Sequence, residues 1–562
     1  MRKSFLALAA AALCCLSCIE INYGVGSDLI PQNQRYKIYT RTIPIENITM
    51  EMADSLSGYS NTRITVGAVR DDLFGLTTRT GVITLIPMFQ DTLDLGKNQI
   101  YKGFHFAAAR DTLSSSRADQ EHIFQTFRVY ELAEPTDVSV NYDCNRPVEH
   151  LGENLAKSTI IYNGGDSLSF NFSDEFGKRC LEDLAKNGVG DIDSYLERFP
   201  GIYIEADAPA GDGGRINMFR LQVDYDSKNY YIRGNHASLN FSAEFDGVRK
   251  DTTLMFYYGA TDFYDLDSLF RTTGNGSFPQ YALNLTSQET EALAGQAGEK
   301  LYVEGGGGLK PRITGLELKH LAEDAIREAG GDPATSVINK ASVILPFEFP
   351  EDYNDMDHWP QVLSPTCRII TEPDEDGEGG MATFMSLSDS SDENANLGDV
   401  NRSTLKYSPD ITYHVQSLVR IDENDTSDEQ TKKLLNGSYD VWFLIMANEL
   451  IETTDVSSSS TNDLYSYLAY QNYYNSIYGY GGYGYGYGYG YGGYSDYYSN
   501  YYTYAMLAAM YSNANTTTQT ETVMLDKDRY YNATLNGPDY PDESLVPQLR
   551  ITFAIPMEEA DY

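Results

Sequence analysis

Short runs of alternating apolar and polar residues, separated by turn residues, are the feature that most constrains this chain. Arg63–Val69 and Leu549–Ile555 alternate with the period of two that is typical of half-buried strands. Further runs rich in β-branched and aromatic residues predict strands at Phe127–Leu132, Gly201–Ala206, Thr253–Tyr258 and Val337–Leu345. Helical spacing is rare and predicts helices at Asp174–Asn187 and Leu318–Ala329. The pattern therefore predicts a mainly β protein.

The length of the chain predicts more than one domain. A chain of 562 residues exceeds one ordinary domain, and its 41% of hydrophobic residues suffices for real cores. Many short strands and a few short helices favour jelly-roll-like β-sandwiches. We expect a first β-sandwich lobe over residues 35–235 and a second over residues 236–562. A low-complexity Tyr/Gly-rich insertion over residues 451–544 interrupts the second lobe.

The N-terminal segment predicts export and a lipid anchor. Two basic residues precede the apolar run Phe5–Leu16, which is too short to span a bilayer and indicates a signal peptide over residues 1–17. Ser17 is the small residue that a lipoprotein signal places before its modified cysteine. Cys18 is therefore the expected lipidation site, and residues 18–34 are the anchor and tether. Cleavage by ordinary signal peptidase, without lipid, is the alternative.

The residues that follow Cys18 indicate the outer membrane. Ile19 stands where an inner-membrane retention signal would have Asp. Glu20 is the one acid in Ile19–Asn22, whereas surface-export signals carry an acidic cluster, so both faces of the outer membrane stay open as destinations.

The net charge of the chain excludes some classes of binding partner, and the spacing of its cysteines predicts free thiols. The chain has 41 Lys and Arg against 81 Asp and Glu, a formal net charge of -40. This balance argues against nucleic-acid binding and disfavours a polybasic contact with an anionic membrane. Cys144, Cys180 and Cys367 lie far apart, and we expect buried free thiols, with a disulfide as the alternative.

No motif predicts catalysis, and we expect a protein that is not an enzyme and needs no cofactor. The seven histidines are scattered, and His150 with Glu153 has the spacing of a metal pair only if Pro147 and Gly152 allow a helix. The chain lacks a Gly-x-Ser-x-Gly elbow. Tetraglycine Gly305–Gly308 lacks the end of a phosphate loop and predicts a tight turn between strands.

Three acidic stretches keep calcium open as an alternative to solvated loops, although we predict no metal site. They are Glu372–Gly377, the group Asp352, Asp355 and Asp357, and the group Asp262, Asp265 and Asp267.

One segment is built for contact. Residues 465–504 hold 18 of the 45 tyrosines, and the centre of the segment is nearly pure Gly-Tyr. A tyrosine offers a large apolar face and a polar tip, which suits interfaces. A tolerated expansion in a surface loop is the alternative, and the low charge also favours aggregation. The candidate binding residues are Tyr478, Tyr480, Tyr483, Tyr485, Tyr487, Tyr489, Tyr491 and Tyr494.

Several short sequence segments together resemble those of a known protein family. They are Gly26–Pro31, Asp72–Gly75, Phe127–Leu132, Leu301–Leu309 and Ile338–Ala341. In this order, over about residues 18–450, the chain resembles the exported Bacteroidetes lipoproteins grouped as domain of unknown function 4270. The resemblance implies an outer-membrane lipoprotein of two β-rich lobes and brings no established activity or catalytic residues.

These observations predict an outer-membrane lipoprotein with a non-enzymatic binding or scaffold role in a cell-envelope assembly. The expected partners are the membrane, through the N-terminal lipid, and an envelope protein or a glycan, but not nucleic acid. A surface glycan-binding or adhesion protein is the alternative. A secreted-type hydrolase is a weaker third reading, supported by the compartment alone.

Overall fold

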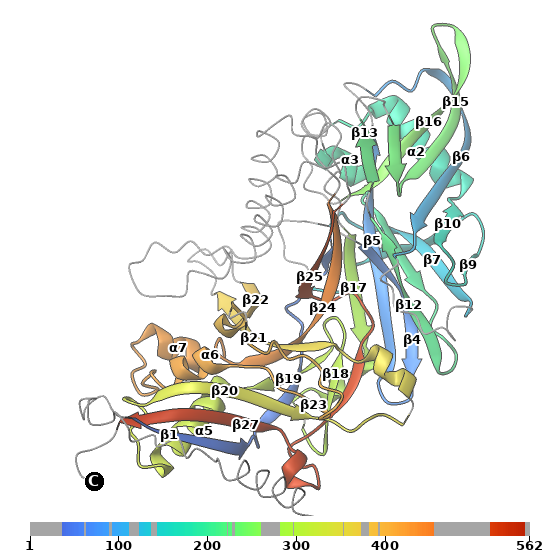
Figure 1. Ribbon diagram of the computed structural model, residues 1–562. Coiled ribbons are helices and arrows are strands. Elements are labelled where there is room, and N and C mark those ends of the chain that lie inside the picture. Colours follow the sequence, from blue (N-terminus) through green and yellow to red (C-terminus); the bar gives the residue numbers. More distant parts are fainter. Residues whose placement is uncertain are drawn as a thin grey trace, which may run out of the picture.

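The structure, a computed structural model, shows a two-lobed molecule (Figure 1). It describes residues 36–60, 63–88, 93–111, 123–136, 143–190, 192–221, 223–226, 231–259, 282–295, 297–351, 353–371, 381–391, 394–453 and 518–556. Each lobe has its own buried core. The chain is mainly β, with several antiparallel sheets and few helices, which confirms the predicted β-sandwich-like class.

Lobe 1, which we define as residues 59–288, is built on one strongly curled sheet of 13 strands. Its strands are β3 (Tyr59–Ser60), β4 (Arg63–Asp71), β5 (Gly75–Met88), β6 (Lys97–Ala109), β7 (Gln125–Leu132), β8 (His150–Asn154), β9 (Ile160–Tyr162), β10 (Ser167–Asn171), β11 (Ile202–Ala206), β12 (Gly213–Arg220), β15 (Ala237–Phe245), β16 (Val248–Gly259) and β17 (Ala282–Gln288). A separate two-stranded ribbon is formed by β13 (Val223–Asp226) and β14 (Tyr231–Gly234).

The long strand β5 explains the curl of this sheet. Its first half pairs with β4 and β17, whereas its second half pairs with β11 and β16. The sheet therefore folds back over itself around β5. Helices α2 (Asp174–Asn187) and α3 (Ile192–Arg198) add buried side chains to the same core. Phe104 lies at the centre of that core, with its ring 4.7 Å from that of Phe172 and 5.1 Å from that of Phe256.

Lobe 2, which we define as residues 36–52 and 297–556, has three sheets. A six-stranded sheet contains β2 (Ile48–Met52), β19 (Leu309–Ile313), β24 (Val441–Thr453), β21 (Val362–Thr371), β22 (Met381–Ser386) and β25 (Thr518–Leu525). A four-stranded sheet has the order β1 (Tyr36–Pro44), β27 (Gln548–Pro556), β20 (Val337–Pro346) and β23 (Lys406–Tyr407). The third sheet is the pair β18 (Lys300–Glu304) and β26 (Asn532–Asn536).

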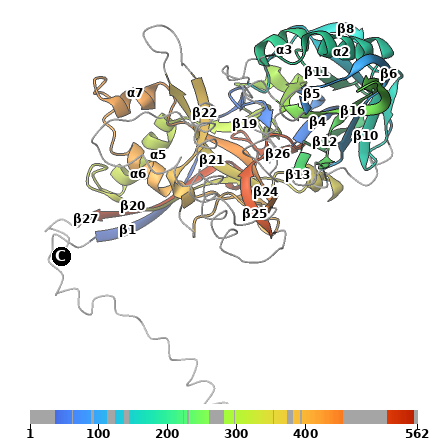
Figure 2. The ribbon, with the colours of Figure 1, turned by 90° about the horizontal axis from the view of Figure 1, so that it is seen from above.

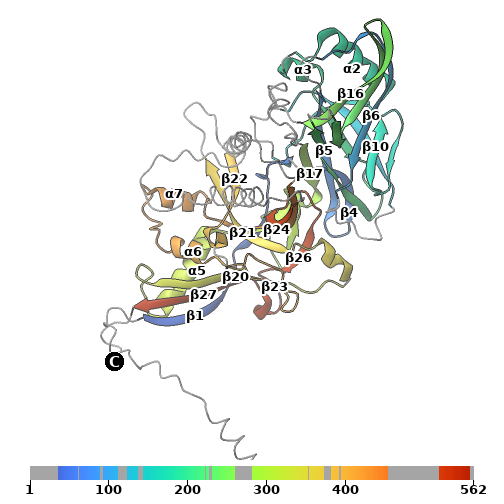
Figure 3. The same ribbon diagram turned by 45° about the horizontal axis from the view of Figure 1, so that its top comes forward.

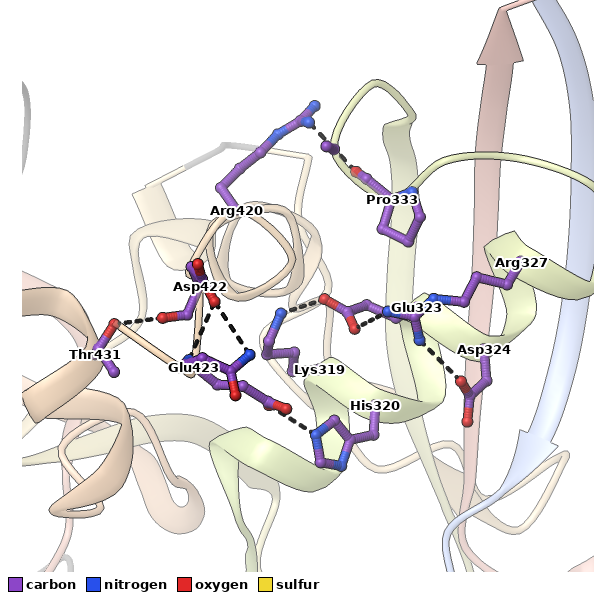
Figure 4. Close-up of polar contacts among 12 residues, drawn as sticks. Lys319, His320, Glu323, Asp324, Arg327, Pro333, Arg420, Asp422, Glu423 and Thr431 are labelled. Carbon is purple, nitrogen blue, oxygen red and sulfur yellow. Dashed lines mark hydrogen bonds and ion pairs between the residues drawn. The ribbon is translucent and has the colours of Figure 1, made fainter. Parts of the chain in front are cut away.

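Three helices complete lobe 2, namely α5 (Gly315–Glu328), α6 (Thr412–Leu418) and α7 (Glu429–Leu435). Thr314 caps the N-terminus of helix α5, because its hydroxyl accepts a hydrogen bond from the backbone N–H of Glu317. Figure 4 shows its polar face, where Glu323 pairs with both Lys319 and Arg327. The described residues also include the short 3-10 turns η4 (Glu289–Leu293), η5 (Tyr353–His358), η6 (Ser388–Ser391) and η7 (Glu543–Leu545).

Several sequence predictions are confirmed at the level of single elements. The helix predicted at Asp174–Asn187 has those bounds, and the strands predicted at Arg63–Val69 and Leu549–Ile555 are present as β4 and β27. Within the described chain, Cys144, Cys180 and Cys367 are buried free thiols, as expected.

The predicted lobe boundary at residues 235/236 is wrong. Strands β15, β16 and β17, which follow residue 236, belong to the sheet of lobe 1. Strands β1 and β2, which precede lobe 1, pair with β27 and β19 in lobe 2. Lobe 1 is thus inserted between two strands of lobe 2. Pairing between strands far apart in the chain decides lobe membership, and no local pattern records it.

The predicted bounds of the Tyr/Gly insertion, residues 451–544, are also too wide. Strand β25 pairs with β24 up to the partners Thr453 and Thr518, and β26 pairs with β18. The segment between the paired strands is therefore residues 454–517, and residues 518–544 return to the fold of lobe 2.

Candidate interaction site

The hairpin of β24 and β25 carries the Tyr/Gly-rich segment. Strand β24 begins in the middle of the six-stranded sheet, where Val441–Ala447 is buried. Its pairing with β21 ends at Met446, and beyond that residue β25 is its one partner among the described strands. Residues 454–517 thus connect the two strands of a ribbon that extends past its parent sheet. Figure 2 shows β24 and β25 from a second direction.

The turn after β25 fixes the base of this hairpin. The Asp526 carboxylate accepts hydrogen bonds from the backbone N–H groups of Asp528 and Arg529, from the Arg529 guanidinium and, at 2.9 Å, from the Tyr531 hydroxyl. Burial alone would raise the pKa of Asp526, but Arg529, its backbone N–H and Arg63 together lower it. Asp526 is therefore held as a fully satisfied buried carboxylate. We call Asp526–Arg529 the root turn.

The root turn also contacts lobe 1. The Lys527 ammonium donates to the backbone carbonyl of Tyr59, at the start of lobe 1, and to that of Ser57, which directly precedes the lobe. Asp528 accepts hydrogen bonds from the Ser60 hydroxyl at 3.3 Å and from the Asn284 amide at 3.1 Å. One short turn of lobe 2 thereby binds two separate segments of lobe 1, and the base of the hairpin is fixed to both lobes.

The tetraglycine turn between β18 and β19 lies beside the root turn. A Cβ atom at Gly307 would lie 2.0 Å from Oδ1 of Asn145, and one at Gly306, where φ is +58°, would lie 2.6 Å from Nη2 of Arg79. Only glycine permits this approach of the two lobes. The prediction of a tight turn between strands is thus confirmed.

A buried lysine closes the tetraglycine turn from inside. The Lys310 ammonium donates to the carbonyls of Gly306 and Gly308, both at 3.0 Å, and to that of Glu304. Burial lowers the pKa of Lys310 to about 7, against the opposing effect of the Glu304 carboxylate. The turn is therefore organised around one amine. A small apolar cluster completes the junction between the lobes and consists of Ala53, Leu56, Cys144, Phe384, Trp442 and Leu444.

The predicted functional residues lie outside the described part of the chain. Neither Cys18 nor any of the eight candidate tyrosines, Tyr478 to Tyr494, is described. The structure does describe the two strands between which those tyrosines are inserted. Among the described residues, no helix is long and apolar enough to cross a membrane.

The weighed metal positions can be placed only in part. His150 and Glu153 lie on strand β8, so the helix-turn spacing of a metal pair is not realised. Asp355 and Asp357 lie in the 3-10 turn η5, and the other acidic stretches of the calcium alternatives lie wholly or partly outside the described residues. Within the described ranges, no group of three or more His, Cys, Asp or Glu side chains is placed to hold a metal ion.

His150 instead belongs to an aromatic stack on lobe 1. Its ring lies 4.4 Å from that of Tyr130 and 4.5 Å from that of Tyr203. On the neighbouring positions, Arg128 makes a two-pronged ion pair with Asp207 at 2.5 and 2.9 Å. We call these five residues the aromatic patch. The alternation of β7 and β11 predicts two faces, but not that a distant histidine stacks on one of them.

The root turn is the part of the site that sequence reasoning missed. Asp-Lys-Asp-Arg at residues 526–529 has the composition of an exposed loop, and only the packing of two lobes buries it. In comparisons with known proteins, no protein family, no curated protein and no solved structure matches the chain.

Proposed function

We propose that this chain is an outer-membrane lipoprotein, anchored through Cys18, with a non-enzymatic binding or scaffold role in a cell-envelope assembly. The Tyr/Gly-rich segment is its contact element. The observation that supports this proposal is the placement of that segment between the paired residues Thr453 and Thr518 of a ribbon whose base is fixed to both lobes.

The physical argument concerns orientation. A contact segment that is attached by a single loose end transmits its position poorly to the body of the protein. Here both ends leave from one ribbon, and the ribbon ends in the root turn with its buried ion pair between Asp526 and Arg529. The attachment point is therefore fixed relative to the body, as a scaffold requires, while tyrosines provide contact area at low entropic cost.

Crosslinking in intact cells tests this function. We expect the native protein to yield crosslinks to an envelope partner. A variant in which the eight candidate tyrosines are replaced by serine, with length and glycines kept, should lose them. Replacement of the same eight residues by phenylalanine is the matched control, since it keeps the rings and should retain most of the crosslinks. Recovery of monomer alone, or unchanged crosslinks in the serine variant, would overturn the proposal.

Glycan binding at the cell surface is the second candidate function, and the aromatic patch on lobe 1 favours it. Aromatic rings beside fixed polar groups are the usual components of small-molecule sites. A glycan array probed with the native protein and with Tyr203→Ala tests this alternative. Binding that Tyr203→Ala abolishes, and that the variant with the eight candidate tyrosines replaced by serine keeps, would support it. An array without any ligand would remove it.

A further inference from the structure

Arg79 of lobe 1 is buried at the junction between the lobes without a hydrogen-bond partner. It lies on β5, between Gly67 of β4 and Thr286 of β17, and is 2% exposed. Figures 1 and 3 show β5 and β17 on the side of lobe 1 that faces lobe 2. Among the described residues, none accepts a hydrogen bond from its Nε, Nη1 or Nη2, and no acidic oxygen lies within 4.0 Å of them. A buried charge of this kind requires a counter-charge in contact with it.

Two other buried arginines, which lie close enough to Asp526 to lower its pKa, have acidic partners. Arg63 forms an ion pair with Asp111 at 3.2 Å, and Arg529 forms one with Asp526. These two side chains and Arg79 are each at most 7% exposed, so all three guanidinium groups have lost most of their contact with water. Of the three, Arg79 alone lacks a counter-charge in contact within the described part of the junction.

The acids of the junction do not neutralise Arg79 by contact. Burial lowers the pKa of Arg79, and Asp528 and Glu304 offset this effect only from a longer distance. Oε2 of Glu304 accepts hydrogen bonds from the Thr290 hydroxyl and from the backbone N–H of Leu309, whereas Oε1 has no partner among the described residues. Burial raises the pKa of Glu304, which favours its neutral form. The counter-charge that Arg79 requires therefore has to come from outside the chain.

The tetraglycine turn of lobe 2 supplies further donors beside this guanidinium. The N–H groups of Gly305 and Gly308 are hydrogen-bonded, whereas those of Gly306 and Gly307 have no acceptor among the described residues, although the turn is buried. Gly306 has a φ of +58°, and successive N–H groups in such a turn form an anion-binding nest. A Cβ atom on Gly306 would lie 2.9 Å from Cζ and from Nη1 of Arg79. Side-chain and backbone donors without acceptors thus meet at one place.

We propose that the junction binds one chloride ion between the Arg79 guanidinium and the N–H groups of Gly306 and Gly307. A single negative charge neutralises Arg79, and a monatomic ion suits the close approach of the turn to the guanidinium. The ion contacts lobe 1 through Arg79 and lobe 2 through the turn, so it stabilises the junction. This inference is independent of the lipid anchor and of the Tyr/Gly-rich segment in the proposed function.

Anomalous diffraction locates the ion directly. Crystals of the full chain with Cys18→Ser, which cannot receive the lipid, are grown with sodium bromide in place of chloride, since bromide is a halide that scatters anomalously. We expect an anomalous peak in contact with the Arg79 guanidinium and the tetraglycine turn. Bromide at the protein surface alone, a water molecule in the proposed position, or an Arg79 side chain that pairs directly with Asp528 or Glu304 would overturn the inference.

The chloride dependence of stability tests the same site in solution. Chloride is exchanged for gluconate at constant ionic strength, and denaturant titrations measure the ratio of folded to unfolded protein. Above the dissociation constant of the ion, this ratio should rise about tenfold for each tenfold increase in chloride. Arg79→Met removes the charge that requires the ion, so the variant should lose this dependence. Arg79→Lys keeps the charge and should retain part of it.

Arg215→Met is the matched control for general effects of the salt. Arg215 is a buried arginine of β12 in the same lobe, and its guanidinium donates to Oδ1 of Asn217 at 2.6 Å and to the Ile123 carbonyl at 3.2 Å. Its removal should lower stability but keep the full chloride dependence. An equal chloride dependence in the native protein and in Arg79→Met would overturn the inference. If Arg79→Met does not fold, the bromide crystals of the protein with its native Arg79 decide the question.

Discussion

The two lobes solve the same folding problem with different chain connectivity. Lobe 1 is one continuous segment, whereas lobe 2 is assembled from strands on both sides of it. The difference predicts an asymmetry. If lobe 2 unfolds, lobe 1 loses only the support of its ends. If lobe 1 unfolds, a long flexible chain separates β2 from β18, and closing it costs lobe 2 about 5 kcal/mol of entropy.

Core truncations in each lobe should show this asymmetry with the largest effect. Phe104→Ala and Phe553→Ala each remove a fully buried ring and should cost about 3–5 kcal/mol. In calorimetry, Phe553→Ala should lower one unfolding transition, whereas Phe104→Ala should lower the transitions of both lobes. Phe124→Ala is the control, because that side chain is 72% exposed and its loss should change stability by less than about 0.5 kcal/mol. A Phe104→Ala protein in which lobe 2 keeps its transition would contradict the asymmetry.

The junction should couple the lobes through Lys310. Lys310→Met leaves the carbonyls of Glu304, Gly306 and Gly308 without their donor and should cost about 3 kcal/mol. The two lobes should then unfold at more widely separated temperatures. Lys300→Met on β18 removes a partly exposed ion pair with Glu348 and a contact with the Tyr540 ring, and should cost about 1 kcal/mol or less. Equal effects of the two changes would show that the buried amine does not organise the turn.

The stability of lobe 2 should depend on pH through two buried groups whose pKa values shift in opposite directions. Burial lowers the pKa of His414 to about 4 from 6.5, so its contribution to stability is present above pH 6.5 and is lost as the pH falls through 4. Burial raises the pKa of Asp389 to about 6 from 3.8, so its contribution is present below pH 3.8 and is lost as the pH rises through 6. The two slopes oppose each other in the window between about pH 4 and 6.

Single substitutions should reveal each slope. With Asp389→Asn, the free energy of unfolding should fall by up to about 3 kcal/mol between pH 6.5 and 4, whereas with His414→Gln it should rise by a similar amount between pH 6 and 4. Denaturant titrations of lobe 2 across this range measure both slopes against the native protein. If the free energy of unfolding changed with pH in the same direction in both variants, the predicted opposing effects of Asp389 and His414 would be refuted.

Substitution of the helix-capping residues should give the smallest effects, and the two lobes can be compared directly because each has such a cap. Ser173 caps α2 in lobe 1, and Thr314 caps α5 in lobe 2, each by accepting one backbone N–H. Ser173→Ala and Thr314→Ala should each cost about 1 kcal/mol, and each loss should appear first in the transition of its own lobe. Thr314→Ser keeps the acceptor and should cost much less. A loss shared equally by both transitions would argue for one cooperative unit.

The sequence predicts local structure well and chain connectivity poorly. The helix Asp174–Asn187 follows from the spacing of its apolar residues and from Ser173, and both are local. The tight turn at Gly305–Gly308 could also be predicted, since four consecutive glycines between two strands favour a turn. The pairing of Tyr36 with Pro556 has no local signature, so the sequence placed β1 in the wrong lobe. The candidate site combines both cases: its tyrosines are visible in composition, but the burial of the Asp526–Arg529 turn after β25 is not.

The pairing of β1 with β27 constrains the order of folding in a chain that is synthesised from its N-terminus. Thr40 and Thr552 are 512 positions apart in the sequence, so β1 cannot pair with β27 until nearly the whole chain is present. Lobe 1 is complete by residue 288 and can fold while the rest is still being delivered. By folding, it brings the ends of β2 and β18 together and shortens the effective loop that β27 must close. Lobe 1 would thus act as an intramolecular assembly aid for lobe 2, and truncation near the C-terminus would leave strand β1 without its neighbour β27.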